Sequence, residues 1–186
     1  MDPFDYALGL LAVLFGLALA DIANSVHKLV RHGGSVRWDG RVVAATLLVI
    51  VIIIRLWFSI WSVRSFGSVL VFPFYLWMFV ELMILFLLAA NCLPDDPAPD
   101  CDLGTFYDGN RRIFWSIFAV FQLSYGLHWV YFVGDGAPLR IWAAVFVPLL
   151  LYVLLVFVRA RWLQYAVPIL VVGFEVMVNW NRSLGG

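Results

Sequence analysis

Five ionisable side chains stand inside long apolar stretches of this sequence. They are Asp21, Arg55, Glu81, His128 and Glu175. A charge at the centre of a bilayer costs about 2.5–3.5 kcal/mol on insertion scales, so such groups are paired, solvated or protonated. Carboxylates and imidazoles are also the side chains that carry protons through membranes. The set therefore indicates either structural ion pairs or a path for protons or ions.

Three of these groups are expected at one depth. Counted from the basic residue at the start of each stretch, at about 1.5 Å per residue, Arg55 and Glu175 lie about 21 Å deep and His128 about 24 Å. We therefore predict that Arg55 pairs with Glu175, with His128 close to both. No basic residue is expected at the level of Glu81, so we expect this carboxyl to be protonated or to lie in a hydrated cavity.

The first apolar stretch carries a polar face near its end. Asp21, Asn24, Ser25 and Lys28 recur at i, i+3, i+4 and i+7, so they share one side of a helix. Such a face points into the bundle, into water or at a partner. The same stretch also carries small residues suited to close helix packing, at Gly9, Ala12, Gly16 and Ala23. We therefore expect this helix to be central in the bundle.

These groups leave two functions open. The first, which we expect, is a non-enzymatic partner or scaffold subunit whose polar face and small residues bind another membrane protein or a second copy. The second is a small proton or ion channel or transporter whose path runs from His128 and Glu175 through Glu81 to Asp21, with Arg55 beside it. A hydrated cavity reaching Glu81 would favour the conductor, and a dry interior would favour the subunit.

The sequence does not indicate enzymatic chemistry, a cofactor or a metal. Ser124 and His128 are four residues apart on one helix, yet no orienting acid or oxyanion donors are evident beside them. The three histidines differ in depth, which is poor geometry for haem. Cys92 and Cys101 have no histidine near them in the sequence, which leaves too few ligands for zinc. The sequence leaves open whether these two cysteines pair.

The elements that must position these groups are membrane-spanning helices. Of 186 residues, 64% are hydrophobic and 13% are charged, and the mean hydropathy is +0.95. So large an apolar excess exceeds what one globular core can bury. Acidic residues rather than basic ones precede Ala18-Leu19-Ala20, so we expect no signal-peptide cleavage there. We predict a single all-α domain, a polytopic transmembrane helix bundle of about six spans, at residues 4–26, 42–62, 69–90, 113–133, 141–158 and 162–180.

The distribution of basic residues predicts the orientation. Eight Lys and Arg residues flank the spans on one side and three on the other. Cytoplasmic loops carry the excess, so we expect both termini outside and both cysteines in the reducing cytoplasm. The net charge is zero, which does not suggest nucleic acid as a partner. Anionic lipid headgroups are a candidate partner for the basic residues after the first span, which are Lys28, Arg31, Arg37 and Arg41.

Two segments resemble a group of small uncharacterised bacterial multi-pass inner-membrane proteins. The run from Gly16 to Asp21, with the basic Val36-Arg37-Trp38, is similar to the opening of that group. The runs Leu93-Pro94-Asp95 and 110–114 (Asn-Arg-Arg-Ile-Phe) resemble its central loop. The resemblance implies a location in the bacterial inner (plasma) membrane, and it implies no activity.

Overall fold

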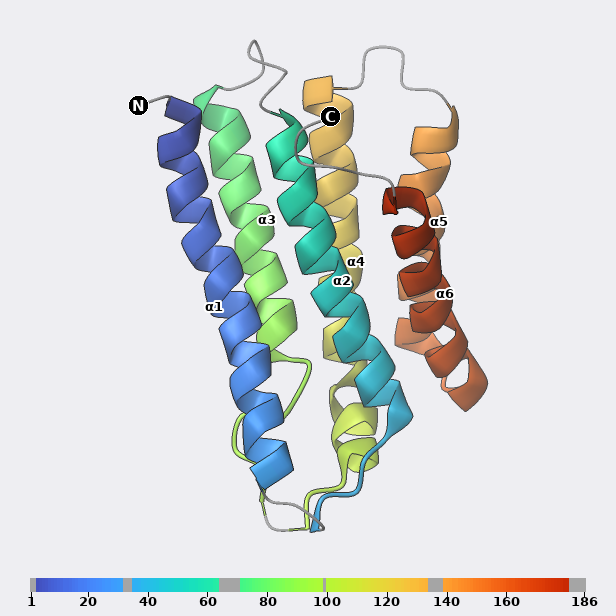
Figure 1. Ribbon diagram of the computed structural model, residues 1–186. Helices are drawn as coiled ribbons and strands as arrows, with labels where there is room; N and C mark the ends of the chain where they lie inside the picture. The colour runs from blue at the N-terminus through green and yellow to red at the C-terminus, as the bar shows by residue number, and fades with distance from the viewer. Residues whose placement is uncertain (1–2, 32–34, 64–70, 99, 134–138, 181–186) are drawn as a thin grey trace.

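The computed structural model describes residues 3–31, 35–63, 71–98, 100–133 and 139–180. Over these ranges the chain forms six antiparallel helices and no strand (Figure 1). They are α1 (Pro3–Arg31), α2 (Gly40–Val63), α3 (Phe72–Ala90), α4 (Leu103–Val133), α5 (Leu139–Phe157) and α6 (Arg161–Asn179). Five of these helices are long and apolar enough to cross a membrane, and the apolar part of α5, Val145–Phe157, is shorter. The predicted all-α helix bundle is confirmed, and five of its helices are compatible with membrane spans, where about six were predicted.

The helix ends follow local chemistry that hydropathy does not detect. Pro73 stands in the first turn of α3, where a missing N–H costs nothing. The start of the third predicted span, residues 69–70, lies outside the described residues. The fourth helix begins ten residues before the predicted position 113, because Asp102 accepts hydrogen bonds from the backbone N–H of Gly104 (2.8 Å) and Thr105 (3.2 Å). Its first three turns are polar, so they lie beyond the apolar span.

The arrangement of the helices corrects one prediction. We expected the first helix to be central, but α1 lies at the edge of the bundle and packs mainly against α3 (Figure 1). A Cβ atom added at Gly9 or Gly16 would meet nothing within 4 Å. The small residues therefore face away from the bundle. Helical spacing shows which residues share a face, but it does not show whether another helix covers that face.

The core is densely aromatic where α4 meets α5. Trp115 stacks on Tyr152 with ring centroids 5.8 Å apart, and Phe118 packs against the same tyrosine at 4.5 Å. All three side chains are fully buried. We call Trp115, Phe118, Phe121 and Tyr152 the aromatic layer. Offset and edge contacts of this kind stabilise a core beyond the area that they bury.

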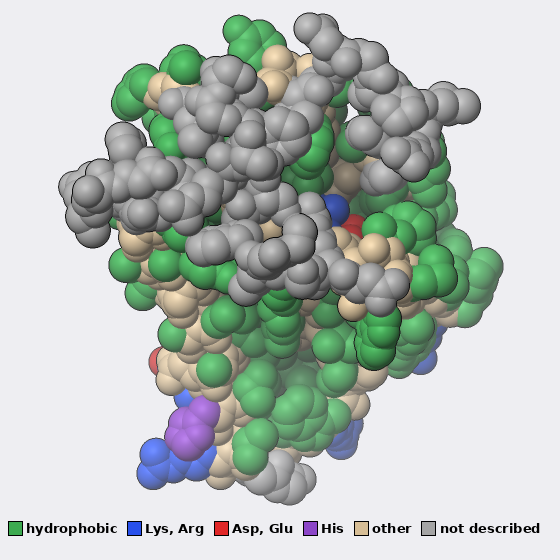
Figure 2. Space-filling view, turned by 45° about the horizontal axis from the view of Figure 1, so that its top comes forward, with side chains coloured by type: hydrophobic (Ala, Val, Ile, Leu, Met, Phe, Trp, Pro, Cys, Tyr) green, Lys and Arg blue, Asp and Glu red, His purple; other side chains and the backbone are tan. Residues whose placement is uncertain are grey.

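The outer surface is suited to lipid around its sides. Large apolar side chains such as Leu150, Leu170 and Met177 are exposed, and Figure 2 shows hydrophobic side chains over much of the visible face. Basic side chains and a histidine gather at the end of the bundle opposite the chain termini (Figure 2). A surface with an apolar girdle and one basic end is typical of a membrane protein.

Two loops are joined at the basic end. Arg37 donates its backbone N–H to the carbonyl of Cys101 (2.9 Å) and accepts a hydrogen bond from the N–H of Leu103 (3.1 Å). Cys92 and Cys101 are both free thiols. Burial raises the pKa of the Cys92 thiol well above its usual range, so this cysteine is a packing group rather than a nucleophile at neutral pH.

Candidate functional site

The predicted pair of Arg55 and Glu175 is confirmed. Arg55 on α2 donates from Nη1 to Oε1 of Glu175 on α6, at 3.1 Å. The two side chains are 14% and 10% exposed. The Nδ2 of Asn179, one turn further along α6, donates to the backbone carbonyl of Glu175 (2.8 Å) and contacts its Oε2 (3.3 Å). The pair joins α2 to α6 with two opposite charges in a largely buried setting.

Arg55 also contacts the centre of the bundle. Its guanidinium carbon lies 4.5 Å from the centroid of the Tyr125 ring on α4, a cation–π contact. The Nε and Nη2 atoms of Arg55 and the hydroxyl of Tyr152 are buried without a hydrogen-bond partner among the described residues. Leaving a buried donor without a hydrogen bond costs free energy. These three polar atoms therefore favour ordered water beside Arg55 and Tyr152.

Glu81 and His128 form a second pair, which corrects two predictions. The Nδ1 atom of His128 on α4 lies 3.0 Å from Oε2 of Glu81 on α3. We expected His128 beside Arg55 and Glu175, and Glu81 without a partner at its level. Depth along the helices placed Glu81 and His128 at different levels, but α3 packs against α4, whereas α2 packs against α6. The histidine therefore meets the carboxylate of the neighbouring helix.

Aromatic rings enclose the histidine. Phe74 and Phe132 meet its ring edge-on at centroid distances of 4.8 and 5.2 Å, and Trp77 stacks on it at 5.8 Å. Trp77 donates its indole N–H to the hydroxyl of Ser124 at 3.0 Å. The enclosure holds the ring in one orientation and excludes bulk water from it.

A small cavity adjoins this pair. It has a volume of about 30 Å³, and its polar lining comes from Ser59, Glu81, Tyr125 and His128. Such a volume holds about two water molecules. The Oε1 atom of Glu81 and the Nε2 atom of His128 are buried and have no hydrogen-bond partner within the described part of the chain. The cavity walls are mainly apolar, so water there would be held by these two atoms and the few polar groups beside them.

A larger recess lies between α2 and α6. Its volume is about 340 Å³, and Arg55, Glu175 and Asn179 contribute polar groups to its lining. Its other walls are the apolar side chains of Val51, Ile54, Phe58, Val176 and Trp180. We call it the outer recess. On the face that contains the chain termini, Figure 2 shows a basic and an acidic side chain adjacent in a recess.

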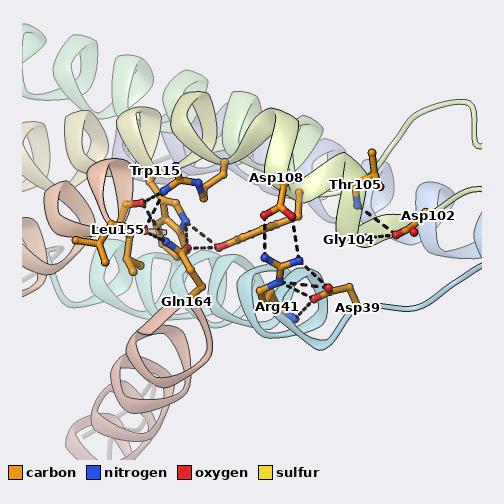
Figure 3. Close-up of polar contacts among 12 residues, drawn as sticks. Asp39, Arg41, Asp102, Gly104, Thr105, Asp108, Trp115, Leu155 and Gln164 are labelled. Carbon is orange, nitrogen blue, oxygen red and sulfur yellow. Dashed lines mark hydrogen bonds and ion pairs between the residues drawn. The ribbon is translucent and has the colours of Figure 1, made fainter. Parts of the chain in front are cut away.

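A third polar cluster, which the sequence did not predict, lies at the basic end (Figure 3). Arg41 binds Asp39 with N–O distances of 2.9–3.2 Å and Asp108 at 2.8 Å. Tyr107 donates its hydroxyl to Oε1 of Gln164, beside the cation–π contact of its ring with Arg41. These contacts join α2, α4 and α6. Arg41 is buried in ion pairs, so it is not available to lipid headgroups as we expected.

The Asp39 carboxyl shows the electrostatic effect of this cluster. Its hydrogen bonds with Arg41 hold its pKa below the usual range of an aspartate. Asp39 therefore stays ionised, and paired with Arg41, to a lower pH than an ordinary aspartate would. The signal that could have found this cluster is the turn chemistry of Asp102, which starts α4 early enough to bring Tyr107 and Asp108 beside α2.

Arg111 anchors the end of α5. Its Nη1 donates to the carbonyls of Leu155 (2.9 Å), Val156 (3.2 Å) and Val158 (3.0 Å). The last carbonyls of a helix have no partner within the helix and carry partial negative charge, so a buried guanidinium is well matched to them. The contact fixes α5 to α4 at the basic end.

The polar face predicted on α1 is divided. Ser25 is buried, Asn24 is exposed, and Asp21 is half-buried with its Oδ2 unpartnered among the described residues. Lys28 donates to the backbone carbonyl of Asp95 at 2.6 Å. Asp21 lies close enough to Cys92, just past the end of α3, to act on its thiol. Cys92 lies eleven residues after Glu81, which is about 16 Å along the chain of α3. The structure therefore does not bring Asp21 or Asn24 to the Glu81 site.

Among the described residues, no group of three or more His, Cys, Asp or Glu side chains is placed to hold a metal ion. Comparison of the chain with protein-family models, curated proteins and solved structures finds no match. In one half of the described bundle, buried ionisable groups form two pairs, Glu81–His128 and Arg55–Glu175. Tyr125 lies beside both, since it lines the cavity at the first and stacks on the arginine of the second.

Proposed function

We propose that the protein is a non-enzymatic proton-conducting protein of the bacterial inner membrane, in which the Glu81–His128 pair holds the moving proton. The observation that carries the proposal is the contact of these two side chains, at 3.0 Å, beside a cavity with room for water. Carboxylate–imidazole pairs inside membrane helices are typical of proton relays.

The geometry allows the proton to move between the two groups and beyond them. One proton placed between Nδ1 of His128 and Oε2 of Glu81 satisfies both atoms. Water in the cavity would meet the remaining polar atoms, Nε2 and Oε1, and pass the proton toward Tyr125. From there the Arg55–Glu175 pair leads to the outer recess.

The other half of the bundle is closed in this state. Trp115 lies 13 residues before His128 on α4, about 20 Å away, and the aromatic layer fills the core at its level. Transfer to the basic end therefore requires α4 and α5 to separate there. Pro148 lies inside α5 and Pro168 inside α6, and proline weakens the backbone ladder that would resist such a bend. We infer alternating access rather than an open pore.

The proposed orientation places both termini outside and the basic end in the cytoplasm. It is supported by the basic side chains that gather at one end of the bundle (Figure 2). Under this orientation the Glu81 site is reached from outside and closed toward the cytoplasm.

Proton flux into liposomes tests the proposal. Purified protein is reconstituted with a pH-sensitive dye inside, and a potassium gradient with valinomycin sets the membrane potential. We expect potential-driven acidification that Glu81→Gln and His128→Gln each reduce to the rate of empty liposomes. Asp95→Asn is the matched control, because it makes the same carboxyl-to-amide change at an exposed loop position. Folded wild-type protein without flux would refute the proposal.

A partner subunit remains the second candidate, on a different observation. The small residues Gly9 and Gly16 on α1 have open space around them, so that side of the helix can receive a second copy or another membrane helix. With Cys92 and Cys101 replaced by serine, Gly16→Cys would form a disulfide-linked dimer in membranes if two copies meet on this face. Efficient cross-linking combined with absent flux would favour the subunit over the conductor.

A further inference from the structure

The outer recess combines charge with apolar walls. Arg55 and Glu175 form its charged floor, and Asn179 donates to the glutamate. The remaining lining comes from apolar and aromatic side chains of α2 and α6. Its volume of about 340 Å³ lies in the range of ligand pockets. Because it opens on the side of the bundle between two helices, it can be entered from the bilayer.

The charge of the floor limits the ligand. Arg55 and Glu175 are one cation and one anion, both about nine-tenths buried. A ligand with a single charge would pair with one of them and leave the other without a partner, which is costly in a buried setting. A zwitterion with an anionic and a cationic group can satisfy both. The recess therefore selects for a ligand without net charge that carries two opposite charges.

The depth of the two charged side chains and the apolar character of the recess walls indicate that the ligand is a lipid. Glu175 lies four residues, about 6 Å, from the end of α6, and Arg55 lies eight residues, about 12 Å, from the end of α2. These depths are near the boundary between headgroups and acyl chains. Trp180 lines the recess, and tryptophan is enriched at this boundary. Val51, Ile54 and Val176 offer an apolar surface of the kind that acyl chains contact.

We propose that the outer recess binds a zwitterionic phospholipid with a phosphoethanolamine headgroup. Arg55 donates to the phosphate through Nη1, since its Nε and Nη2 atoms are buried, and a charge-assisted hydrogen bond of this kind is stronger than a neutral one. Glu175 accepts a hydrogen bond from the primary ammonium. The acyl chains run along the apolar wall toward the middle of the bilayer. The inference concerns the outer end of the proposed proton path, but it does not rest on conduction, because lipid binding is an equilibrium event that can be measured without proton flux.

Native mass spectrometry tests the site directly. Wild-type protein is released from micelles that contain equal amounts of phosphatidylethanolamine and phosphatidylglycerol, and the retained lipids are counted. We expect retention of phosphatidylethanolamine over phosphatidylglycerol by about tenfold, which corresponds to about 1.4 kcal/mol. The double variant Arg55→Gln/Glu175→Gln should reduce the ratio to about one. Arg112→Gln/Asp95→Asn makes the same kind of change at two exposed positions at the opposite end of the bundle, so it should leave the ratio unchanged.

A second variant protects the test against a folding defect. Val176→Trp fills the apolar side of the recess without changing a charge, and it should also lose the bound lipid. Equal retention of both lipids by wild type, retention of neither, or preference for phosphatidylglycerol would each overturn the proposal. Loss of proton flux in Glu81→Gln with lipid retention unchanged would separate the two proposals.

Discussion

Removing one member of the Arg55–Glu175 pair should destabilise the protein more than removing both. At the observed N–O distance of 3.1 Å, the attraction is about 5 kcal/mol at an effective dielectric constant of about 20, and desolvation opposes it. Glu175→Leu leaves the Arg55 guanidinium without a partner, and Arg55→Met leaves the Glu175 carboxylate without one. Each single variant should therefore lower the free energy of unfolding by about 3–5 kcal/mol. The double variant replaces the pair by apolar groups of similar volume and should lie close to wild type.

A double-mutant cycle measures this coupling. Unfolding of the wild type, both single variants and the double variant is followed by circular dichroism as SDS is titrated into non-ionic micelles. We expect a coupling free energy of at least about 2 kcal/mol. Leu170→Ala, on the exposed side of α6, is the control and should change stability by less than about 0.5 kcal/mol. Additive single effects would mean that the two side chains do not stabilise one another, and would refute a stabilising buried ion pair.

Three further predictions concern other parts of the fold. A Cβ atom at Gly126 would overlap a buried valine of α5, so Gly126→Ala should lower the free energy of unfolding by about 1–3 kcal/mol. Gly109 on the same helix has open space around it, so Gly109→Ala should be neutral or stabilising by up to about 1 kcal/mol. Thermal unfolding of the two variants compares these effects. The lowered pKa of Asp39 means that its contribution to stability is present above its unfolded pKa of about 3.9 and is lost as pH falls through its lower folded pKa. The stability difference between wild type and Asp39→Asn should therefore be constant near neutral pH and shrink only in strong acid. Because Cys92 is buried with a raised pKa, a maleimide should label the partly exposed Cys101 first, and mass spectrometry should find Cys92 labelled only after denaturation.

The sequence predicted what depends on hydropathy and depth. Apolar runs of about 20 residues identify helices because the bilayer sets their length. The Arg55–Glu175 pair followed from opposite charges at equal depth, since a membrane leaves few alternatives for such groups.

What the sequence did not predict depends on which helices are neighbours. His128 was assigned to the wrong partner because its estimated depth matched that of Glu175, whereas the packing of α3 on α4 brings it to Glu81. The predicted central position of α1 was wrong because helical spacing does not show which helices are neighbours. The cluster around Arg41 was missed because the start of α4 is polar, and hydropathy does not detect a polar helical turn whose inward residues, Tyr107 and Arg111, are buried.

The bond between the two loops at the basic end also bears on biosynthesis. Arg37 pairs through its backbone with Cys101 and Leu103, so this junction can form as soon as residue 103 has left the ribosome. We expect the first three helices to be joined to the start of α4 before α5 and α6 are synthesised. The last two helices, separated by only residues 158–160, would then enter the membrane together as a hairpin and dock on an assembled half. A truncated chain that ends at residue 133 and has been released from the ribosome should accordingly already protect the junction from proteases.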